Sequence, residues 1–576
     1  MKVSFIVPVY NTAHPILWIC INSILHSLQN QHELIVIDDA STSPDTLEFL
    51  SKWSSQLDFP VKLIRNSENC GVSYSLNKGI AASGGNFIAP VDHDDLIIPT
   101  GFAAATRYQQ YFGSTWLYTD EQQVNQKGYL VNNFFKPDFS QQLLRSVMYI
   151  NHLQVFSREL FEQVNGYREG FEGSQDHDLA LRMSELVTPL HVPVLGYQWR
   201  IQPDTQSRKQ FTVSETVTES SLLAISEHFQ RRGYRSSVKI ARTGSSTYHA
   251  RIVPDSGQNV SVIIPCRLGT KRTVNGQELI LLEHCLKHLR ETTLDSLSQY
   301  ANQLLEVILV LNHDDDPGIA DHLLEHFGFQ GQSIVDESGF NFARKCNLGA
   351  KVSRGKILVF LNDDTQMITK NWIDSVVSLL TEDDVACVGG MLINEDGTVQ
   401  SCGDLVGSSS ANHYDPDPSP DNVGDPMQRY VVDHETSSVS GAFFCCPKSV
   451  FSSLGGFSLA FPNSFQDVDF CLRARRQRLR CIISPSIRLF HFESSSREPT
   501  VDDETLEILR TVHADLLAPL DSFQLWRYQP VRVRWFSYQG LPYVRNQVKV
   551  FTKNLISQIA RRVWPKARTR FKPLIP

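Results

Sequence analysis

Three acidic side chains follow an apolar run at residues 87–95, where Asp92, Asp94 and Asp95 come directly after Phe87–Val91. The apolar run predicts a buried strand, so the acids would lie at the carboxyl edge of a sheet, where open α/β folds bind ligands. Carboxylates this close together favour a cation. Oxygen ligands on a short turn suit Mg²⁺ or Mn²⁺, which could in turn hold a diphosphate. The alternative is a solvated acidic turn that caps the next element.

The same pattern returns at residues 357–364, where an apolar run is followed by Asn362, Asp363 and Asp364. A constant spacing of 270 residues relates five marked positions of the two segments: Asn77, Gly79, Gly85, Asp92 and Asp94 in the first, and Asn347, Gly349, Gly355, Asn362 and Asp364 in the second. We therefore predict two copies of one domain, fused in tandem.

The first copy opens with an apolar run at residues 3–7, continues with apolar side chains at helical spacing, and reaches a second apolar run at 33–37 that ends in Asp38 and Asp39. A strand–helix–strand unit of this kind is parallel and right-handed, so Asn11 should lie beside these two acids. The acids could bind the base or ribose of a nucleotide, or cap the following helix. The Gly-rich dinucleotide fingerprint and the phosphate loop are both absent, which argues against NAD enzymes and ordinary ATPases.

A second shared motif lies late in each copy, at the expected start of an amphipathic helix. Two aspartates stand two residues apart and an arginine follows the first by six: Asp176, Asp178 and Arg182, then Asp467, Asp469 and Arg473. A carboxylate at a helix N-terminus is stabilised as the anion, which suits a metal ligand, a helix cap or a general base.

Together these motifs resemble the family 2 glycosyltransferases of the GT-A fold, specifically the tandem enzymes that build bacterial surface polysaccharides such as O-antigen. The resemblance covers about residues 1–200 and 258–497. Further segments that carry it are Tyr118–Glu121, Phe135–Asp138 and Tyr197–Arg200 in the first copy, and Gly339–Phe342 and His491–Arg497 in the second. It implies an α/β protein with two tandem GT-A domains, the Rossmann-like fold of nucleotide-diphospho-sugar transferases.

The resemblance implies inversion at the anomeric carbon by direct displacement, with Asp176 and Asp467 as general bases. It also implies a divalent cation, Mg²⁺ or Mn²⁺, that stabilises the departing nucleotide diphosphate and is held by Asp92, Asp94, Asp364 and His491. Nucleotide-sugar contacts are implied at Pro8, Tyr10, Asn11, Asp38, Asp39, Asn77, Asp92, Pro265, Asn312, Asn347, Asn362 and Asp363. Acceptor-side or donor-side contacts are implied at Asp120, Glu121, Gln175, Trp199, Arg200, Gln466 and Arg497.

Two positions depart from the family pattern. Gln198 stands where the family commonly has the histidine that matches His491, so we expect the first copy to bind metal less tightly. Leu311 stands at the position of Asp38, so the nucleotide contacts of the second copy would rest on Asn312. Three interpretations stay open: two working sites, one working site with a degenerate partner, and a non-catalytic scaffold that binds nucleotide sugars or glycans.

A chain of 576 residues, 41% of them hydrophobic, is too long for one core and can bury two or more. We predict a GT-A domain at residues 1–205, a helix-plus-β connector at 206–257, a second GT-A domain at 258–515 and a basic amphipathic helical tail at 516–576. The eleven cysteines show no paired metal spacing, and we expect reduced core thiols rather than ligands.

Charge is distributed unevenly along the chain. The formal net charge is −8, whereas residues 522–576 hold twelve Lys or Arg and no Asp or Glu, which leaves about −20 for the rest. An acidic body argues against nucleic acid as a partner. In the tail, Val548, Phe551, Leu555 and Ile559 form a helical apolar stripe among basic residues, which suits an anionic membrane surface or the protein's own acidic body.

The sequence shows neither a signal peptide nor a run long enough to span a membrane. We therefore expect a cytoplasmic enzyme, peripheral on the inner face of the cell membrane. Its expected partners are nucleotide-diphosphate sugars and a glycan or lipid-linked acceptor.

Overall fold

The computed structural model describes residues 1–28, 31–54, 61–201, 215–242, 245–254, 258–293, 305–406, 411–413, 419–420, 427–492 and 503–517. The predicted tail therefore lies almost entirely outside the described residues. None of the helices in these ranges has the length and apolar character needed to cross a membrane.

The first domain is a nine-stranded sheet with strand order β3-β2-β1-β4-β8-β6-β9-β5, and β7 pairs with β6. Its elements are β1 (Val3–Val9), α1 (His14–Leu25), β2 (Glu33–Asp38), α2 (Pro44–Ser54), β3 (Val61–Arg65), α3 (Val72–Ala82), β4 (Phe87–Pro90), β5 (Leu96–Ile97), α4 (Pro99–Phe112), β6 (Trp116–Val124), β7 (Leu130–Phe134), α5 (Gln141–Ser146), β8 (Gln154–Ser157), α6 (Arg158–Gln163), α7 (Gln175–Ser184) and β9 (Leu190–Arg200). The predicted strand–helix–strand start is present, and β1 pairs in parallel with β2 and β4.

The second domain repeats this order over eight strands, as β16-β15-β12-β17-β24-β19-β25-β18, with β20 and β23 added at β19 and β25. Its elements are β12 (Val260–Pro265), β13 (Lys271–Val274), β14 (Gln277–Ile280), α9 (Leu281–Thr293), β15 (Leu305–Asn312), α10 (Pro317–His326), β16 (Gln330–Asp336), α11 (Phe342–Val352), β17 (Ile357–Leu361), β18 (Thr365–Met367), α12 (Trp372–Leu379), β19 (Val385–Ile393), β20 (Val399–Ser401), β21 (Asp404–Val406), β22 (Ala411–His413), β23 (His434–Glu435), β24 (Phe443–Pro447), α13 (Lys448–Ser453), α14 (Gln466–Arg476), β25 (Arg480–His491) and α15 (Asp503–Val512). The matching strand orders confirm the tandem α/β fold.

Both faces of each sheet are buried, which explains the uninterrupted apolar runs in the parallel strands. Phe5 of β1 points into the core under α1, and Ile6 points into the opposite core under α3. The repeated glycines have a packing cause. A Cβ at Gly79 of α3 would stand 2.4 Å from Ile37, and one at Gly349 of α11 would stand 2.4 Å from Ile263, so only glycine lets these helices approach their strands.

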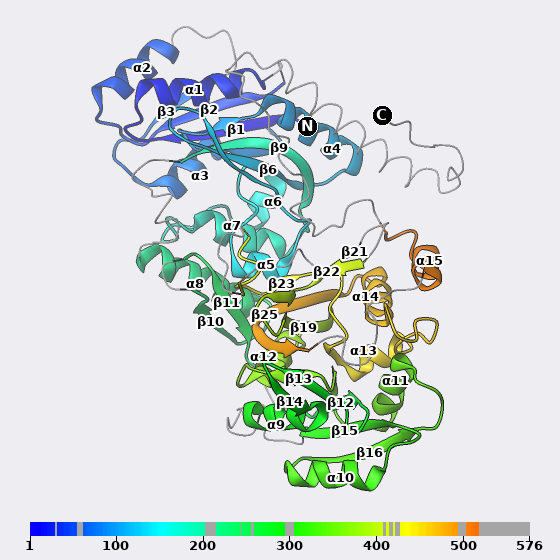
Figure 1. The fold of residues 1–576 in the computed structure, drawn as a ribbon. Helices are drawn as coiled ribbons and strands as arrows, with labels where there is room; N and C mark the ends of the chain where they lie inside the picture. The colour runs from blue at the N-terminus through cyan, green and yellow to red at the C-terminus, as the bar shows by residue number, and fades with distance from the viewer. Residues whose placement is uncertain are drawn as a thin grey trace.

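The connector consists of α8 (Glu215–Arg231) and the hairpin of β10 (Ser236–Ile240) and β11 (Tyr248–Ile252). In Figure 1 the first domain, in blue and cyan, lies above the second, in green to orange, and the connector lies beside their junction. Ile225 and Phe229 of α8 share a core cluster with residues of the first domain and with Val432 of the second. The connector is therefore packed, as predicted, and it joins the two domains. The predicted domain limits stay a prediction.

A buried ionic cluster joins the domains at α5. Glu382 of the second domain accepts bonds from Arg145 of α5 at 2.5 and 2.9 Å, from Arg232 at 3.0 Å and from Arg480 at 2.9 Å. Arg145 and Glu382 are both buried. Burial disfavours the charged form of Glu382, but the arginines outweigh it and hold the pKa of Glu382 well below its usual range. A buried guanidinium needs this carboxylate, so the contact fixes how the two domains meet.

We expect Glu382→Ala to lower the free energy of unfolding by about 3–5 kcal/mol, because Arg145 would stay buried without its carboxylate. The urea midpoint of the chain measures this effect. Glu48→Ala is the control, since it removes only an exposed pair with Lys52 and should leave the midpoint unchanged. Equal midpoints for the two variants would contradict the role assigned to Glu382.

Candidate active sites

The acidic turn of the first domain lies directly after β4. Asp95, at its end, is buried and accepts hydrogen bonds from the Tyr197 hydroxyl at 2.9 Å and the Arg200 N–H at 2.7 Å. Arg200 Nε also donates to the Asp94 carbonyl at 2.9 Å. Arg200, which the sequence placed on the substrate side, therefore fastens the turn to β9. The carboxylate of Asp92 is left half-exposed.

His152 reaches this turn from the loop before β8. Its Nε2 lies 3.3 Å from Asp92 Oδ2, and its Nδ1 lies 3.6 Å from Oε2 of the buried Glu121 on β6. Burial disfavours the imidazolium, but the contacts with Asp92 and Glu121 outweigh burial and hold the pKa of His152 well above its usual range. His152 was not predicted, because it follows no strand; its only sequence signal is a polar pair, Asn151 and His152, inside an apolar stretch.

The second domain builds a similar pair with His491 of β25, although its acid, Asp364, corresponds to Asp94 rather than to Asp92. Its Nε2 lies 3.3 Å from Asp364 Oδ1, and its Nδ1 lies 2.7 Å from Oε1 of Gln400 on β20. In each domain one histidine nitrogen thus faces the acid of the turn. In the second domain the other nitrogen is hydrogen-bonded to Gln400, as is typical of metal-binding histidines, whereas in the first it faces Glu121 without a hydrogen bond. Gln400 was not predicted. Among the described residues, Asp364 Oδ1 and Asn362 Oδ1 are buried and accept no hydrogen bond.

The strand registers correct the match between Gln198 and His491. Gln198 of β9 faces Leu96 of β5, whereas His491 of β25 faces Thr365 of β18. In the repeat Thr365 corresponds to Asp95, one position before Leu96. The counterpart of His491 in the first domain is therefore Trp199. Trp199 is 40% exposed and cannot ligate a metal, so the imidazole of the first domain comes from the loop before β8 instead.

Asp176 lies in the first turn of α7 beside the acidic turn. Burial and the charge of Asp92 raise the pKa of Asp176 to about 6. Gln175 Nε2 donates to Asp176 Oδ2 at 3.1 Å and so orients the carboxyl group. Asp178 has a different role: it pairs with Arg182 at 2.6 Å and braces the helix. In the motif that the two copies share, the first aspartate is therefore available for chemistry, and the second forms a structural ion pair with the arginine.

Asp467 begins α14 in the same way. Its Oδ2 accepts the Gly441 N–H at 2.6 Å, and burial together with Asp404 raises the pKa of Asp467 to about 6. Asp469 pairs with Arg473 at 2.6 Å. Both domains thus hold a half-buried carboxyl group whose pKa suits a general base near neutral pH.

Asn11, Asp38 and Asp39 meet at the sheet edge, where their polar atoms hold loops. Asn11 Oδ1 accepts two backbone N–H groups of the loop before α2, and Asp38 Oδ1 accepts a third at 2.9 Å. Asp39 accepts the N–H groups of Cys70 and Gly71, both at 2.9 Å, at the start of α3. Asp39 thus holds the loop that leads into α3.

Asn77 and Asn347, which the sequence predicts as nucleotide-sugar contacts, each hold a loop. The Asn77 amide donates to the Tyr167 carbonyl at 2.8 Å and accepts its N–H at 3.0 Å, and Asn347 makes the same two bonds with Phe457. Both ends of each amide are used. These residues brace the loop that precedes the helix of Asp176 or Asp467.

Asp120 and Glu121 are buried in β6 rather than open to an acceptor. Asp120 Oδ1 accepts the Lys136 N–H at 2.8 Å and lies 3.0 Å from His191 Nε2, so it is a structural residue. Glu121 lies 3.1 Å from Lys136 Nζ and faces His152. Its role at the site is to orient that histidine.

The other predicted residues fall in three groups. Pro8 lies within β1, Pro265 ends β12 and Asn312 ends β15, so all three stand at or near the expected edge. Tyr10 and Trp199 are exposed at its rim, whereas Gln466 and Asp363 lie among buried groups near Asp467 and Asp364. Arg497 lies outside the described residues.

An open α/β sheet with an acid–histidine pair at its carboxyl edge, next to a half-buried carboxyl group of raised pKa, has the groups that an enzyme of group transfer uses. The chain belongs to the glycosyl transferase family 2, whose model matches residues 4–164 and 282–434. The two matched regions fall in the two domains, and the predicted family is confirmed.

Curated relatives include the O-antigen biosynthesis protein RfbC of Myxococcus xanthus, which is 30% identical over 499 residues, covering 86% of this chain and 38% of the relative. The hyaluronan synthase of Pasteurella multocida is 25% identical over 233 residues, covering 40% of this chain and 23% of that protein. This chain thus spans well under two thirds of these relatives. The solved structure of S. aureus TarS in complex with UDP-GlcNAc is 19% identical, covering 40% of this chain and 66% of that one, with a TM-score of 0.33.

The pKa values near 6 of Asp176 and Asp467 predict how sugar transfer depends on pH. A base must be unprotonated to accept a proton, so kcat/KM should fall about tenfold per pH unit below pH 6 and be level above about pH 7. Initial rates with a saturating glycan acceptor measure this profile. A rate that is constant from about pH 5 to pH 8 would show that neither carboxyl group is the base.

Proposed function

We propose that the chain is an inverting glycosyltransferase that moves sugars from nucleotide-diphosphate donors onto a growing, lipid-linked surface glycan, with one activity in each domain. One observation carries the proposal: each domain independently pairs a histidine with the acid of its turn and places a carboxyl group of pKa about 6 at the start of a helix. A degenerate domain has no need to keep this combination.

In the proposed reaction, Asp176 or Asp467 accepts the proton of an acceptor hydroxyl while that oxygen attacks the anomeric carbon. A single base opposite the leaving group gives inversion in one displacement. The helix N-terminus stabilises the carboxylate before the step, and burial raises its basicity. Gln175 in the first domain and the Gly441 N–H in the second hold the carboxyl group in place.

The residues at the two turns fit a divalent cation. Asp92 and Asp94 with His152 would hold it in the first domain, and Asp364 with His491 in the second. The buried Asp364 Oδ1, which accepts no hydrogen bond from the described residues, is the kind of atom that a cation satisfies. Asp95 also lies within reach of Asp92 and His152, but both its oxygens already accept hydrogen bonds. When bound, Mg²⁺ or Mn²⁺ neutralises charge on the leaving diphosphate.

We expect His152→Ala and His491→Ala each to weaken Mn²⁺ binding by their own domain at least about tenfold, because each removes a nitrogen ligand. Mn²⁺ titration followed by electron paramagnetic resonance, with a nucleoside diphosphate present, measures this directly. Gln198→Ala is the matched control and should bind Mn²⁺ normally, since the register places Gln198 beside Leu96. If only Gln198→Ala bound Mn²⁺ weakly, Gln198 would be the counterpart of His491, as the sequence predicts.

Two activities in one chain predict two different blocked products. Asp176→Asn and Asp467→Asn should each reduce one transfer about 10²–10⁴-fold, since asparagine accepts no proton. On a defined acceptor, each variant should stop after a different sugar, and mixing the two variants should restore elongation. Mass analysis of the products reads this out. If Asp467→Asn made full-length product at the wild-type rate, only the first domain would transfer sugars.

We further propose that the basic tail brings the enzyme to an anionic membrane, where a lipid-linked acceptor would lie. The proposal rests on the sequence of residues 522–576, which lie outside the described residues. Anionic liposomes at low salt should float the whole chain but not a chain that ends at residue 521. Equal flotation of the two would favour a tail that packs on the acidic body.

A further inference from the structure

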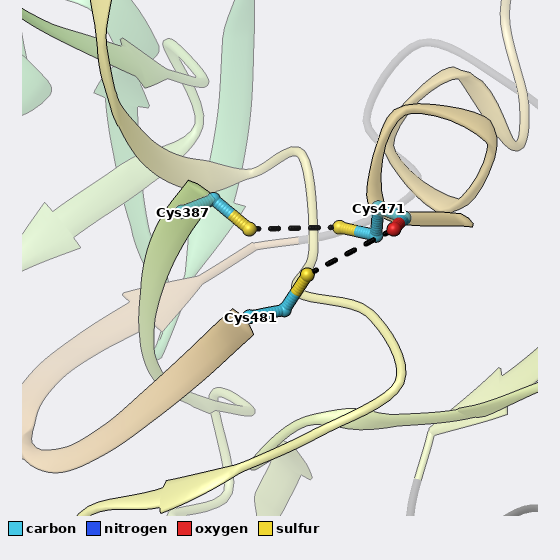
Figure 2. Close-up of side chains that lie close together, drawn as sticks. All are labelled: Cys387, Cys471 and Cys481. Atoms are coloured by element: carbon cyan, nitrogen blue, oxygen red, sulfur yellow. Dashed lines mark hydrogen bonds between the residues drawn. The ribbon is translucent and has the colours of Figure 1, made fainter. Parts of the chain in front are cut away.

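Three cysteines from three different elements meet inside the second domain. Cys387 of β19, Cys471 of α14 and Cys481 of β25 point toward one another, as Figure 2 shows. Their sulfur atoms all lie within 4.8 Å of one another, and those of Cys387 and Cys471 are 3.7 Å apart. All three side chains are buried.

The spacing of the sulfurs matches a shared metal ion. Zn²⁺ binds thiolates at about 2.3 Å, so two thiolates on one tetrahedral Zn²⁺ stand about 3.8 Å apart. The Cys387–Cys471 separation is close to that value and far longer than the roughly 2 Å of a disulfide. We propose that these cysteines form a binding site for a thiophilic cation, Zn²⁺ being the ion whose charge suits three thiolates.

The charge of Arg475 acts on Cys481, so a cation lies beside the cluster. Three thiolates and Zn²⁺ leave a single negative charge, which Arg475 offsets.

Cys481, itself 1% exposed, is one of the residues that line a cavity of about 350 Å³, together with Arg475, Arg480 and Glu435.

The first domain shows that the fold does not require thiols here. By strand register and helix position, Trp116, Ala180 and Pro189 take the places of Cys387, Cys471 and Cys481. Packing alone is thus satisfied by apolar groups in one copy, whereas the other gathers three sulfur ligands. Because thiolates prefer Zn²⁺ and carboxylates prefer Mg²⁺ or Mn²⁺, this site and the acid–histidine sites would take different ions.

The site would also tie together the elements that carry the residues proposed for catalysis. Cys471 lies about one helical turn after Asp467, and Cys481 is the second residue of β25, the strand that ends at His491. A cation here would clamp α14 onto β19 and β25.

Cadmium titration of the full, reduced chain, freed of metal beforehand, tests the proposal, because Cd²⁺–thiolate bonds absorb in the ultraviolet and Cd²⁺–oxygen bonds do not. We expect one equivalent to produce this absorption and Zn²⁺ to displace it. Cys471→Ala, which introduces the residue type of the first domain, should weaken binding about a hundredfold or more. Cys445→Ala, buried in the same sheet but outside the cluster, should bind as the wild type does.

Absence of the thiolate absorption in the wild-type chain at one equivalent of Cd²⁺ would overturn the proposal, and this arm requires no variant to fold. Equal absorption from Cys471→Ala would also overturn it, since the metal would then lie on other cysteines. In either case the three thiols would serve packing alone.

Discussion

The crowding of carboxylates at the end of one strand in each domain is the constraint on which the rest of the site depends. In each turn one acid has a raised pKa: burial and Asp364 raise the pKa of Asp363 to about 7, and burial and Asp92 raise that of Asp95 well above its usual range. In the first domain, hydrogen-bond donors hold the inward-facing acid of the turn. Asp95 takes the Tyr197 hydroxyl and a backbone N–H, and the outward acids face a histidine.

The two domains meet this constraint with histidines from different elements. His491 ends the strand β25, whereas His152 stands in a loop at the position that Ala442 occupies in the second domain, as the pairing of β8 and β24 shows. Both place Nε2 3.3 Å from an acid and turn Nδ1 toward a side-chain oxygen. The geometry is retained while the residue that provides it has changed, so the local charge pattern matters here more than the position in the sequence.

The site residues that follow strand ends could be predicted. An apolar run that stops at polar residues shows where the strand lies and which residues stand at the edge of the sheet. The repeat was visible because Gly79 and Gly349 are fixed by helix–strand contact. His152 could not be predicted, since it meets Asp92 from 60 residues away in a loop without periodicity. The match of Gln198 was one residue off because the register is fixed by the pairing of β5 with β9 and of β18 with β25, which the sequence of these strands does not show. Asn77, predicted as a nucleotide-sugar contact, uses both ends of its amide to brace a loop, a contact that its position in the sequence does not reveal.

The nucleotide edges of the domains differ in charge, and this difference bears on whether the two sites are interchangeable. Asn66 and Ser75 of the first domain are replaced by Asp336 and Lys345 in the second. Lys345 is buried and donates to the carbonyls of Cys266 and Val310, at the ends of the two strands where a nucleotide would lie. Burial lowers the pKa of Lys345, and Asp363 and Asp336 partly offset that effect. A buried ammonium group in place of a hydroxyl changes which groups of a nucleotide sugar can bind at this edge of the sheet. The two domains therefore need not use the same nucleotide sugar, although they share one fold and one proposed chemistry.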